Sequence, residues 1–458
     1  SKGNLDEPVV VNRSDEIGRM AFHFNEMVDN IEGKIHEMES INNLNDSLLS
    51  GSSLSTLMEH AVEEFCNATG AKVGYLGFFE QFSKEKLMGA ASFGIDENKL
   101  EDLELRMKVL VNKLDDDEFH FLPSYAAKNY DLSELFILKI SPQSEPLQDV
   151  AEVLSEISEN EDNEVTVQIE GFLALGNFDK EVLKKDKLDF LHSFASQTGT
   201  VILKAYLDKI KKDNEEGQDI QQGLMPSEAP DSRGLLDISF SFVAAKYLGG
   251  DFYDFVEFND SNHIGMVISD VSGKGVGPSL FGTTCQAYLR LLAIDPNSTG
   301  ETLEYMNERL CENKNNSLFA TAFYLTINLN NLKMTYSSAG HNKMYLYRKR
   351  THSIEYLSAK GLVLGMFTPC VYETQDLQLE EGDWIILYTD GITELENSTL
   401  ELYGMERFEK LLLANVDKSA EDMKELIIED LELYRESVAP SDDITFIVAK
   451  IVAEDSNS

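Results

Sequence analysis

The segment from Gly234 to Val452 constrains the fold most strongly, because short apolar runs with strand spacing alternate there with helical runs in two separate groups. The strand-like runs are Ile238–Ala244, His263–Ser269, Ala320–Leu329, Lys333–Ser337, Met344–Arg348, Trp384–Thr389 and Ile444–Val452. The helical runs are Pro278–Ile294, Glu301–Lys314, Met405–Ala414 and Ala420–Val438. Hairpin-like strands with grouped helices predict an antiparallel α+β sandwich rather than a doubly wound parallel sheet.

Acidic motifs recur at the predicted turns of this segment. They are GGDFYD around Asp251, ISDVSGKG around Asp270, LYTDG around Asp390, and SDDIT with Asp442 and Asp443. A single aspartate at a strand end more often caps its own loop than points into a cleft. Four such motifs in one domain favour a metal site, because hard divalent cations prefer clustered oxygen ligands and the chain lacks a zinc-like set of His and Cys.

The order of these motifs resembles that of the PPM family, the metal-dependent protein serine/threonine phosphatases of the 2C type, and within it the SpoIIE/RsbU branch. The matching stretches are YLGGDFYDF, ISDVSGKGVG, SSAGHNKMYLY, GLVLGM, EGDWIILYTDGITE and SDDITFIVAKI. The preceding DIQQGLMPSEAP also resembles a segment of that branch. The resemblance covers residues 234–458 and implies a phosphatase domain with an α/β-β/α sandwich.

The resemblance also implies a site for two ions, Mn²⁺ or Mg²⁺, both of which accept carboxylate and water ligands. Asp270 would bridge the two ions, and the backbone carbonyl of Val271 would bind one of them. Asp251 would bind near the first ion or orient the bridging water. Asp251 and Asp270 are therefore the expected catalytic residues. Because a water activated between two ions attacks phosphorus directly, no nucleophilic Ser or Cys is needed.

The second ion of the implied pair would be held by Asp390 and Asp442. Asp443 is the alternative ligand beside Asp442. We prefer Asp442 because it fills the first place of the family motif D-[DN]-x-[ST].

Several neighbours of these motifs have two readings. Lys246 and Lys274 are candidates to meet the substrate phosphate, although an exposed lysine is usually only solvated. His341 in AGHN is more often a turn residue than a proton donor to the leaving serine. Gly249 and Gly250 allow a tight backbone turn beside the ions, and they also suit an ordinary hairpin.

Residues 1–51 read as one long helix with coiled-coil spacing, which predicts a homodimer. One seam contains Ile17, Phe24, Ile31 and Met38, and the other contains Met20, Met27, Ile41 and Leu48. The alternative is a surface helix packed on its own domain. DEIG followed by FNEM resembles the start of the second helix of a HAMP signalling module. The first HAMP helix and the membrane helix that usually precedes it are not found, so we expect the cytoplasmic part of a longer inner-membrane receptor.

Residues 52–207 read as one α/β unit. A helix over Leu54–Thr69 ends at the C-cap Gly70, and strands are predicted at Val73–Phe79 and Gly171–Leu175. The stretch GFLALGNFDKEVLKKDKLDFLHSFASQTGTVI resembles a GAF sensor domain, which implies a site for a small-molecule ligand. The acidic stretch 141–164 reads as a solvated loop.

Residues 208–233 form the predicted helical linker. The helix continues from Leu203 to Leu224, with a weak stretch at Asp213–Gly217, and Pro226 and Pro230 then stop it. The alternative is a plain flexible linker.

The charge balance excludes one class of partner. Lys plus Arg is 39 and Asp plus Glu is 81, so the net charge is −42, which argues against binding nucleic acid. The cysteines (Cys66, Cys285, Cys311 and Cys370) form no C-x-x-C pair, so zinc and thiol-redox functions are disfavoured and a reducing compartment is expected.

The sequence therefore predicts a signal-controlled phosphatase acting on phosphoserine or phosphothreonine of a partner protein. By resemblance, the substrate is a STAS-domain antagonist of an anti-sigma factor. Two alternatives remain. GGDFYD is similar to the GGDEF signature of diguanylate cyclases, although Phe252 replaces the acid after the GGD aspartate. The domain could also be an inactive sensory module, although all four metal aspartates are present.

Overall fold

The structure, a computed structural model, describes residues 9, 16–28, 53–80, 83–95, 120–122, 135–140, 170–177, 185–258, 262–312, 317–436 and 438–452. These residues divide into two compact units, one up to Lys211 and the other from Lys212 onward. The division into domains at 51, 207 and 233 stays a prediction. Among the helices described, none is both long and apolar enough to cross a membrane.

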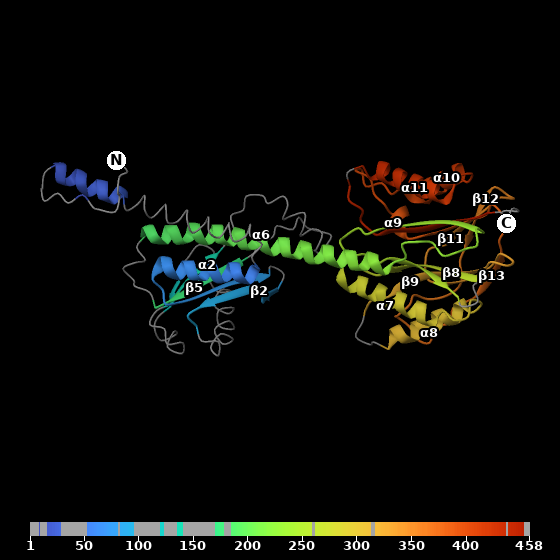
Figure 1. Ribbon diagram of the computed structural model, residues 1–458, viewed down its shortest axis with the longest axis horizontal. Coiled ribbons are helices and arrows are strands. Elements are labelled where there is room, and N and C mark those ends of the chain that lie inside the picture. The colour runs from blue at the N-terminus through green and yellow to red at the C-terminus, as the bar shows by residue number, and fades with distance from the viewer. Residues whose placement is uncertain are drawn as a thin grey trace. The chain divides into compact units, whose positions relative to one another are not determined.

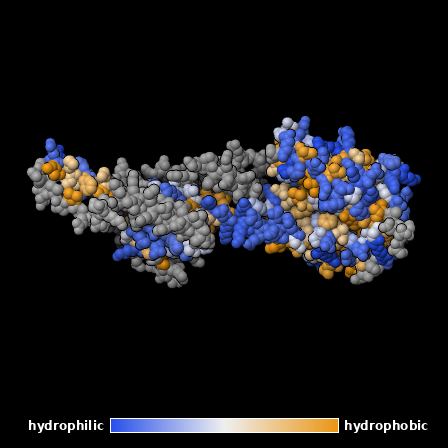
Figure 2. All heavy atoms as spheres, turned by 45° about the horizontal axis from the view of Figure 1, so that its top comes forward, coloured by the Kyte–Doolittle hydropathy of each residue, from blue (hydrophilic) through white to orange (hydrophobic). Residues whose placement is uncertain are grey.

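The described part of the N-terminal segment is a helix over residues 16–28. The predicted seam residues lie on its surface: Ile17 is 53 % exposed, Met20 74 %, Phe24 46 % and Met27 52 %. Figure 2 shows hydrophobic side chains at the surface of this helix. The seam residues beyond Val28 lie outside the described residues, so the coiled-coil dimer stays a prediction.

The first unit is a five-stranded antiparallel sheet in the order β2-β1-β5-β4-β3. Its strands are β1 (Val73–Glu80), β2 (Ser83–Phe93), β3 (His120–Leu122), β4 (Leu135–Ile140) and β5 (Glu170–Gly176). Helix α2 (Leu54–Thr69) and the first part of α6 (Lys185–Leu224) pack on the sheet in one apolar core. Phe65 of α2 and Phe194 of α6 meet in that core with ring centroids 4.7 Å apart.

The sequence located this unit well. Helix α2 has the predicted bounds, and Gly70 caps it with a φ of 68°, the left-handed conformation that glycine adopts readily. Both predicted strands are present as β1 and β5. The antiparallel sheet with helices is compatible with a GAF domain. The thiol of Cys66, a residue of α2, is buried, and burial raises its pKa to about 12, so it is poorly suited to covalent attachment of a ligand.

Helix α6 is continuous from Lys185 to Leu224 and passes through Asp213–Gly217 without a break. It ends before Pro226, where the sequence predicted the stop. The segment is therefore helical rather than a plain flexible linker. Among the residues on its last turns, Ile220 is 67 % exposed whereas Gln221 is buried.

The second unit contains two five-stranded antiparallel sheets (Figure 1). One has the order β13-β10-β9-β8-β7 and the other β12-β11-β14-β15-β6. The strands of the first are β7 (Phe252–Glu257), β8 (His263–Val271), β9 (Ala320–Asn328), β10 (Lys333–Ala339) and β13 (Gln375–Gln378). Those of the second are β6 (Leu236–Val243), β11 (Met344–Arg348), β12 (Ser353–Leu357), β14 (Trp384–Tyr388) and β15 (Ile444–Ile451).

Helices cover the outer faces of both sheets, as Figure 1 shows. Helices α7 (Val276–Leu292) and α8 (Thr299–Cys311) pack on the first sheet. The second sheet carries α9 (Asp390–Thr393), α10 (Gly404–Ala414) and α11 (Ala420–Arg435). Apolar residues of both sheets, such as Ile268 and Ile447, share one core. The predicted α/β-β/α sandwich is therefore confirmed.

The sequence missed three strands and one short helix of this unit. The strands are β7, β12 and β13, and the helix is α9. β12 and β13 are edge strands with largely exposed residues, so they lack the apolar run that marks a buried strand. In β7, Asp254 interrupts the apolar residues, so no continuous apolar run marks the strand in the sequence. Helix α7 also begins two residues before Pro278, at Val276.

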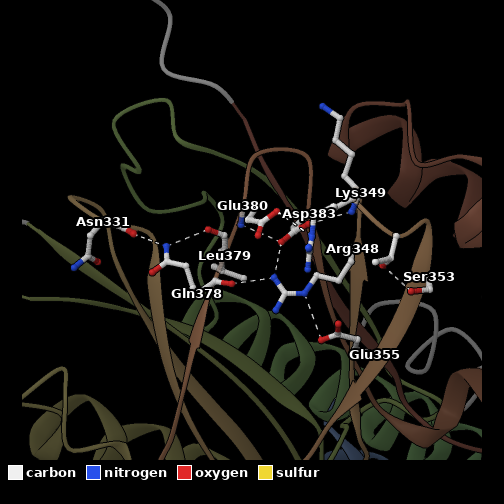
Figure 3. Close-up of polar contacts among 11 residues, drawn as sticks. Asn331, Arg348, Lys349, Ser353, Glu355, Gln378, Leu379, Glu380 and Asp383 are labelled. Carbon is white, nitrogen blue, oxygen red and sulfur yellow. Dashed lines mark hydrogen bonds and ion pairs between the residues drawn. The ribbon is translucent and has the colours of Figure 1, made fainter.

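A largely buried arginine links the two sheets at one end of the sandwich (Figure 3). Arg348, at the end of β11, donates to the carboxylate of Asp383 at 2.8 Å and to the carbonyl of Gln378 at 2.9 Å. Asp383 also accepts the backbone N–H groups of Lys349 and Glu380. The buried carboxylate of Asp383 is thus matched by one cation and two N–H donors.

Candidate metal centre

The register of the strands brings the four acidic motifs to the other end of the sandwich. The start of β7 pairs with the end of β8, since Phe252 lies opposite Ser269. The end of β14 pairs with the start of β15, since Tyr388 lies opposite Phe446. Asp251 precedes β7 and Asp270 ends β8, whereas Asp390 follows β14 and Asp442 precedes β15. Antiparallel pairing therefore places two motifs together in each sheet. The hydrogen bond from Thr445 to Asp251 joins the two pairs across the sandwich.

Asp443 holds the loop that carries Asp251. Its carboxylate accepts the backbone N–H of Ala245 at 2.8 Å, that of Gly250 at 2.6 Å and that of Asp251 at 3.3 Å. The side chain is buried, and its oxygens are engaged by the loop. Asp443 thus links β15 in one sheet to the loop before β7 in the other.

Glycine is required in this loop because other chain segments approach its backbone closely. A Cβ on Gly249 would lie 2.6 Å from Oδ2 of Asp443, and one on Gly250 would lie 2.8 Å from the carbonyl oxygen of Val271. Both distances are shorter than a Cβ tolerates. The two glycines therefore serve close packing, and the carbonyl of Val271 lies beside the loop of Asp251.

Asp251 is the most buried of the predicted ligands, at 2 % exposure. Its Oδ2 accepts the hydroxyl of Thr445 at 2.7 Å. Burial raises its pKa well above the usual range, and the nearby charges of Asp443 and Asp270 raise it further. The protein therefore keeps a carboxylate in a place that disfavours its negative charge.

Asp270 lies at the centre of the group. Its carboxyl is within hydrogen-bonding reach of Asp251, and Asp390 and Asp442 act on it electrostatically. Burial, followed by the charges of Asp390 and Asp442, raises the pKa of Asp270 to about 7. Burial also raises the pKa of Asp390, with Glu394 and Asp442 contributing.

Asp442 is the most accessible of the group, with 40 % of its side chain exposed. Its Oδ2 lies 3.3 Å from Nζ of Lys274, and its Oδ1 accepts the N–H of Asp443 at 2.8 Å. Of the two neighbouring aspartates, Asp442 is partly exposed and pairs with Lys274, whereas the carboxylate of Asp443 is occupied by backbone N–H groups. The choice of Asp442 as the ligand stays a prediction.

The donor set fits hard divalent cations. The predicted side-chain ligands are all carboxylates, and their mutual repulsion is the cost that a bound cation removes. In the described parts of the chain, no three Asp, Glu, His or Cys side chains are grouped closely enough to hold one ion. Mg²⁺ keeps several waters and is often bound by only one or two carboxylates, so this spacing does not conflict with an ion pair of that kind.

His341 is placed as a structural residue. It is buried, its Nδ1 accepts the hydroxyl of Thr321 at 2.7 Å, and its Nε2 donates to the carbonyl of Tyr388 at 3.2 Å. Burial lowers its pKa to about 4, so the ring stays neutral near pH 7. Because both ring nitrogens are engaged between the two sheets, a role as proton donor is not supported.

Two residues that support the site were missed by sequence reasoning. Gln221 of α6 donates to the carbonyl of Gly249 at 2.7 Å and accepts its N–H at 3.1 Å. Arg290 of α7 makes a two-point ion pair with the buried Asp254, at 2.6 Å and 2.9 Å. The sequence offered one sign of the second contact, namely Asp254, the second aspartate of GGDFYD. Its partner Arg290 lies 36 residues away along the chain.

Two family models match separate parts of the chain. A family model described as Stage II sporulation protein E (SpoIIE) matches residues 260–452, and a model of the HAMP domain matches residues 1–33. The HAMP match confirms the N-terminal resemblance and reaches further toward the start of the chain than the two short motifs did.

Curated relatives and a solved structure are similar to the C-terminal part. Phosphoserine phosphatase RsbU of Bacillus subtilis (strain 168) is 33 % identical over 254 residues, which is 54 % of this chain and 72 % of that protein. Phosphoserine phosphatase RsbP of the same organism is 24 % identical over 245 residues, with 53 % and 58 % covered. The SiaA-PP2C domain of Pseudomonas aeruginosa aligns with a TM-score of 0.47 at 18 % identity, over 53 % of this chain and 97 % of that domain.

These matches do not favour the diguanylate cyclase alternative. By its similarity to RsbU and by this architecture, the chain belongs to the SpoIIE/RsbU family of metal-dependent, PP2C-type serine phosphatases.

Proposed function

We propose that this chain is a signal-regulated phosphatase that uses two ions, Mn²⁺ or Mg²⁺, to hydrolyse phosphoserine or phosphothreonine on a partner protein. The observation that carries the proposal is the group of carboxylates at one end of the sandwich. Burial and the charges of Asp443 and Asp270 raise the pKa of Asp251, and burial and the charges of Asp390 and Asp442 raise the pKa of Asp270. A purely structural site would match such charges with cations or N–H donors, as Asp383 is matched.

The proposed ligands are Asp270 as the bridging residue, Asp251 beside it, the carbonyl of Val271, and Asp390 with Asp442. Two bound divalent cations would supply an activated water and charge stabilisation for displacement at phosphorus. The chain's own part is to hold the ligands in place. Thr445 orients Asp251 through its hydroxyl at 2.7 Å.

The proposed substrate is a phosphorylated STAS-domain protein that opposes an anti-sigma factor. This follows from the SpoIIE/RsbU branch to which the motifs belong. Removing the phosphate would let that protein capture the anti-sigma factor and release a sigma factor.

The test is release of phosphate from a phosphorylated STAS-domain protein, with Mn²⁺ and with a chelator. The wild-type chain should release phosphate only with the metal. Asp251→Asn and Asp390→Ala should each lower the rate by at least about a hundredfold, because each removes a ligand of the reacting centre. Unchanged rates in both variants would overturn the metal mechanism and favour the inactive sensory module.

We further propose that α6 controls the site. Gln221 holds the carbonyl and the N–H of Gly249, two residues before Asp251. The side chains of Gln286 and Arg290 donate to the carbonyl of Leu224 at the end of α6. A signal that shifts α6 between a bent and a continuous form at Asp213–Gly217 would therefore reach the metal loop. The continuous form would complete the second metal site.

Stabilising the continuous form tests this regulation. The double variant Asp213→Leu and Gly217→Leu should raise basal activity, since it strengthens the weak stretch. Gly223→Leu is the matched control, because a Cβ there meets nothing within 4 Å, whereas one at Gly217 lies 3.5 Å from Leu248. No change in the double variant, or an equal rise in the control, would indicate a passive helix.

We also propose that the chain works as a homodimer in the cytoplasmic part of a membrane receptor, with a small-molecule signal read by residues 52–207. The HAMP match at residues 1–33 and the exposed seam of Ile17, Met20, Phe24 and Met27 support this arrangement. Sedimentation of the full chain should give a dimer. Phe24→Glu should give a monomer, because a charge in the seam opposes pairing.

A further inference from the structure

Lys274 occupies a special place in the acidic end of the sandwich. It lies in the loop between β8 and α7, between Gly273 and Gly275, which have φ values of 87° and 94°. These left-handed conformations turn the loop tightly. Its Nζ reaches Oδ2 of Asp442 at 3.3 Å and also donates to the carbonyl of Ser441.

The contact between Lys274 and Asp442 stands out because the groups around it are carboxylates. The predicted ligands and their neighbour Asp443 contribute five carboxylates, those of Asp251, Asp270, Asp390, Asp442 and Asp443. Within the described ranges, the pair with Lys274 is the only ion pair that any of them makes. The charge of Asp442 also raises the pKa of Asp270 and that of Asp390. The ammonium of Lys274 therefore contacts a carboxylate that interacts with both of these aspartates. Its side chain is 22 % exposed and long enough to swing away, because lysine has a flexible four-carbon stem.

We propose that Lys274 is a built-in competitor for the metal ion at Asp442: its ammonium holds this carboxylate when the metal is absent and leaves when the metal binds. This rests on the proposed metal site and adds its regulation. A carboxylate oxygen cannot keep an ammonium beside it while a divalent cation takes the same position, because the two cations repel each other strongly at that distance. Metal binding therefore includes the breaking of the Lys274–Asp442 pair.

The direct test measures release of the lysine by chemical labelling. The full chain is treated with an amine-reactive acetylating reagent in chelator and in Mn²⁺, and the labelling rate of each lysine is measured by mass spectrometry. Mn²⁺ should raise the rate at Lys274 at least about threefold, since an amine freed from an ion pair is more accessible. Lys349, which lies 3.7 Å from Glu381 at the other end of β14, should keep its rate. An unchanged or lower rate at Lys274 in Mn²⁺-bound protein would overturn the proposal.

Metal affinity gives a second readout that does not depend on catalysis. Calorimetric titration with Mn²⁺ should show tighter binding to Lys274→Met, by about tenfold, because the competing charge is gone. Lys349→Met is the charge-matched control, since Lys349 pairs with Glu381 at the other end of β14 and its loss also removes one positive charge. It should stay within about twofold of wild type. Equal changes in both variants, or none in Lys274→Met, would reject competition.

Failure of the underlying metal site would look different. If the wild-type chain and Lys274→Met both bound no Mn²⁺, the proposed function itself would fall. If both bound Mn²⁺ with equal affinity, only the role of Lys274 would be wrong.

Discussion

The two ends of strand β14 carry a buried carboxylate, Asp383, and a partly buried one, Asp390, in opposite electrostatic situations. At its start, Asp383 accepts hydrogen bonds from Arg348 at 2.8 Å and from the N–H groups of Lys349 and Glu380 (Figure 3). At its other end, Asp390 meets Glu394 and Asp442, which raise its pKa together with burial.

This difference separates a structural carboxylate from a functional one. A buried charge matched by a cation and N–H donors stabilises the fold, and breaking the match is costly. A group of carboxylates that repel one another weakens the fold until a cation binds. Such a group therefore indicates a functional site rather than a stabilising one. Strand β14 thus lies between two carboxylates in different settings, Asp383 and Asp390, which are seven residues apart in the sequence.

The largest contrast is expected in activity. Asp270→Asn should lower the hydrolysis of p-nitrophenyl phosphate in Mn²⁺ at least about a hundredfold, because the bridging ligand of the proposed ion pair is lost. Its thermal transition without metal should be unchanged or higher, since one repelling charge is removed. Activity within tenfold of wild type would show that the two ends do not differ in function.

The next contrast concerns stability. Asp383→Ala should lower the free energy of unfolding of the phosphatase unit by about 3 kcal/mol, because Arg348 is left largely buried without its partner. Its activity at low temperature should stay close to wild type. Glu355→Ala, which removes an exposed partner 3.3 Å from Arg348, is the control and should cost less than about 1 kcal/mol. A loss of activity without a loss of stability in Asp383→Ala would break the comparison.

The smallest effect is a pH dependence at the metal end. The pKa of Asp270 is raised to about 7 in the folded protein, so between about pH 4 and pH 7 the folded state keeps a proton that the unfolded state has lost. Stability of the metal-free protein should therefore fall as the pH rises through this window. Denaturation in chelator at pH 5 and pH 7 should show a steeper fall for wild type than for Asp270→Asn. Saturating Mn²⁺ should reduce this loss of stability with pH. Equal pH dependence of the free energy of unfolding in wild type and Asp270→Asn, measured in chelator, would contradict the raised pKa of Asp270.

Local patterns in the sequence predicted much of the fold. Apolar runs gave seven strands and four long helices of the second unit, with shifts of one to a few residues at their ends. They also gave α2 with its Gly70 cap, because amphipathic spacing and a left-handed glycine are properties of consecutive residues. Edge strands β12 and β13 were missed because exposed residues carry no such pattern.

The candidate site divides in the same way. Acidic motifs at strand ends and their resemblance to the PPM family predicted the ligands Asp251, Asp270, Asp390 and Asp442, and this assignment stays a prediction. Only the tertiary structure decided that Asp443 holds the loop of Asp251, that Lys274 pairs with Asp442, and that His341 stays neutral between the sheets. Their partners lie from 20 to 192 residues away along the chain, and such contacts depend on how the sheets pack. The spacing of apolar residues along the chain indicates where a strand lies, but it does not indicate which distant segment packs against that strand.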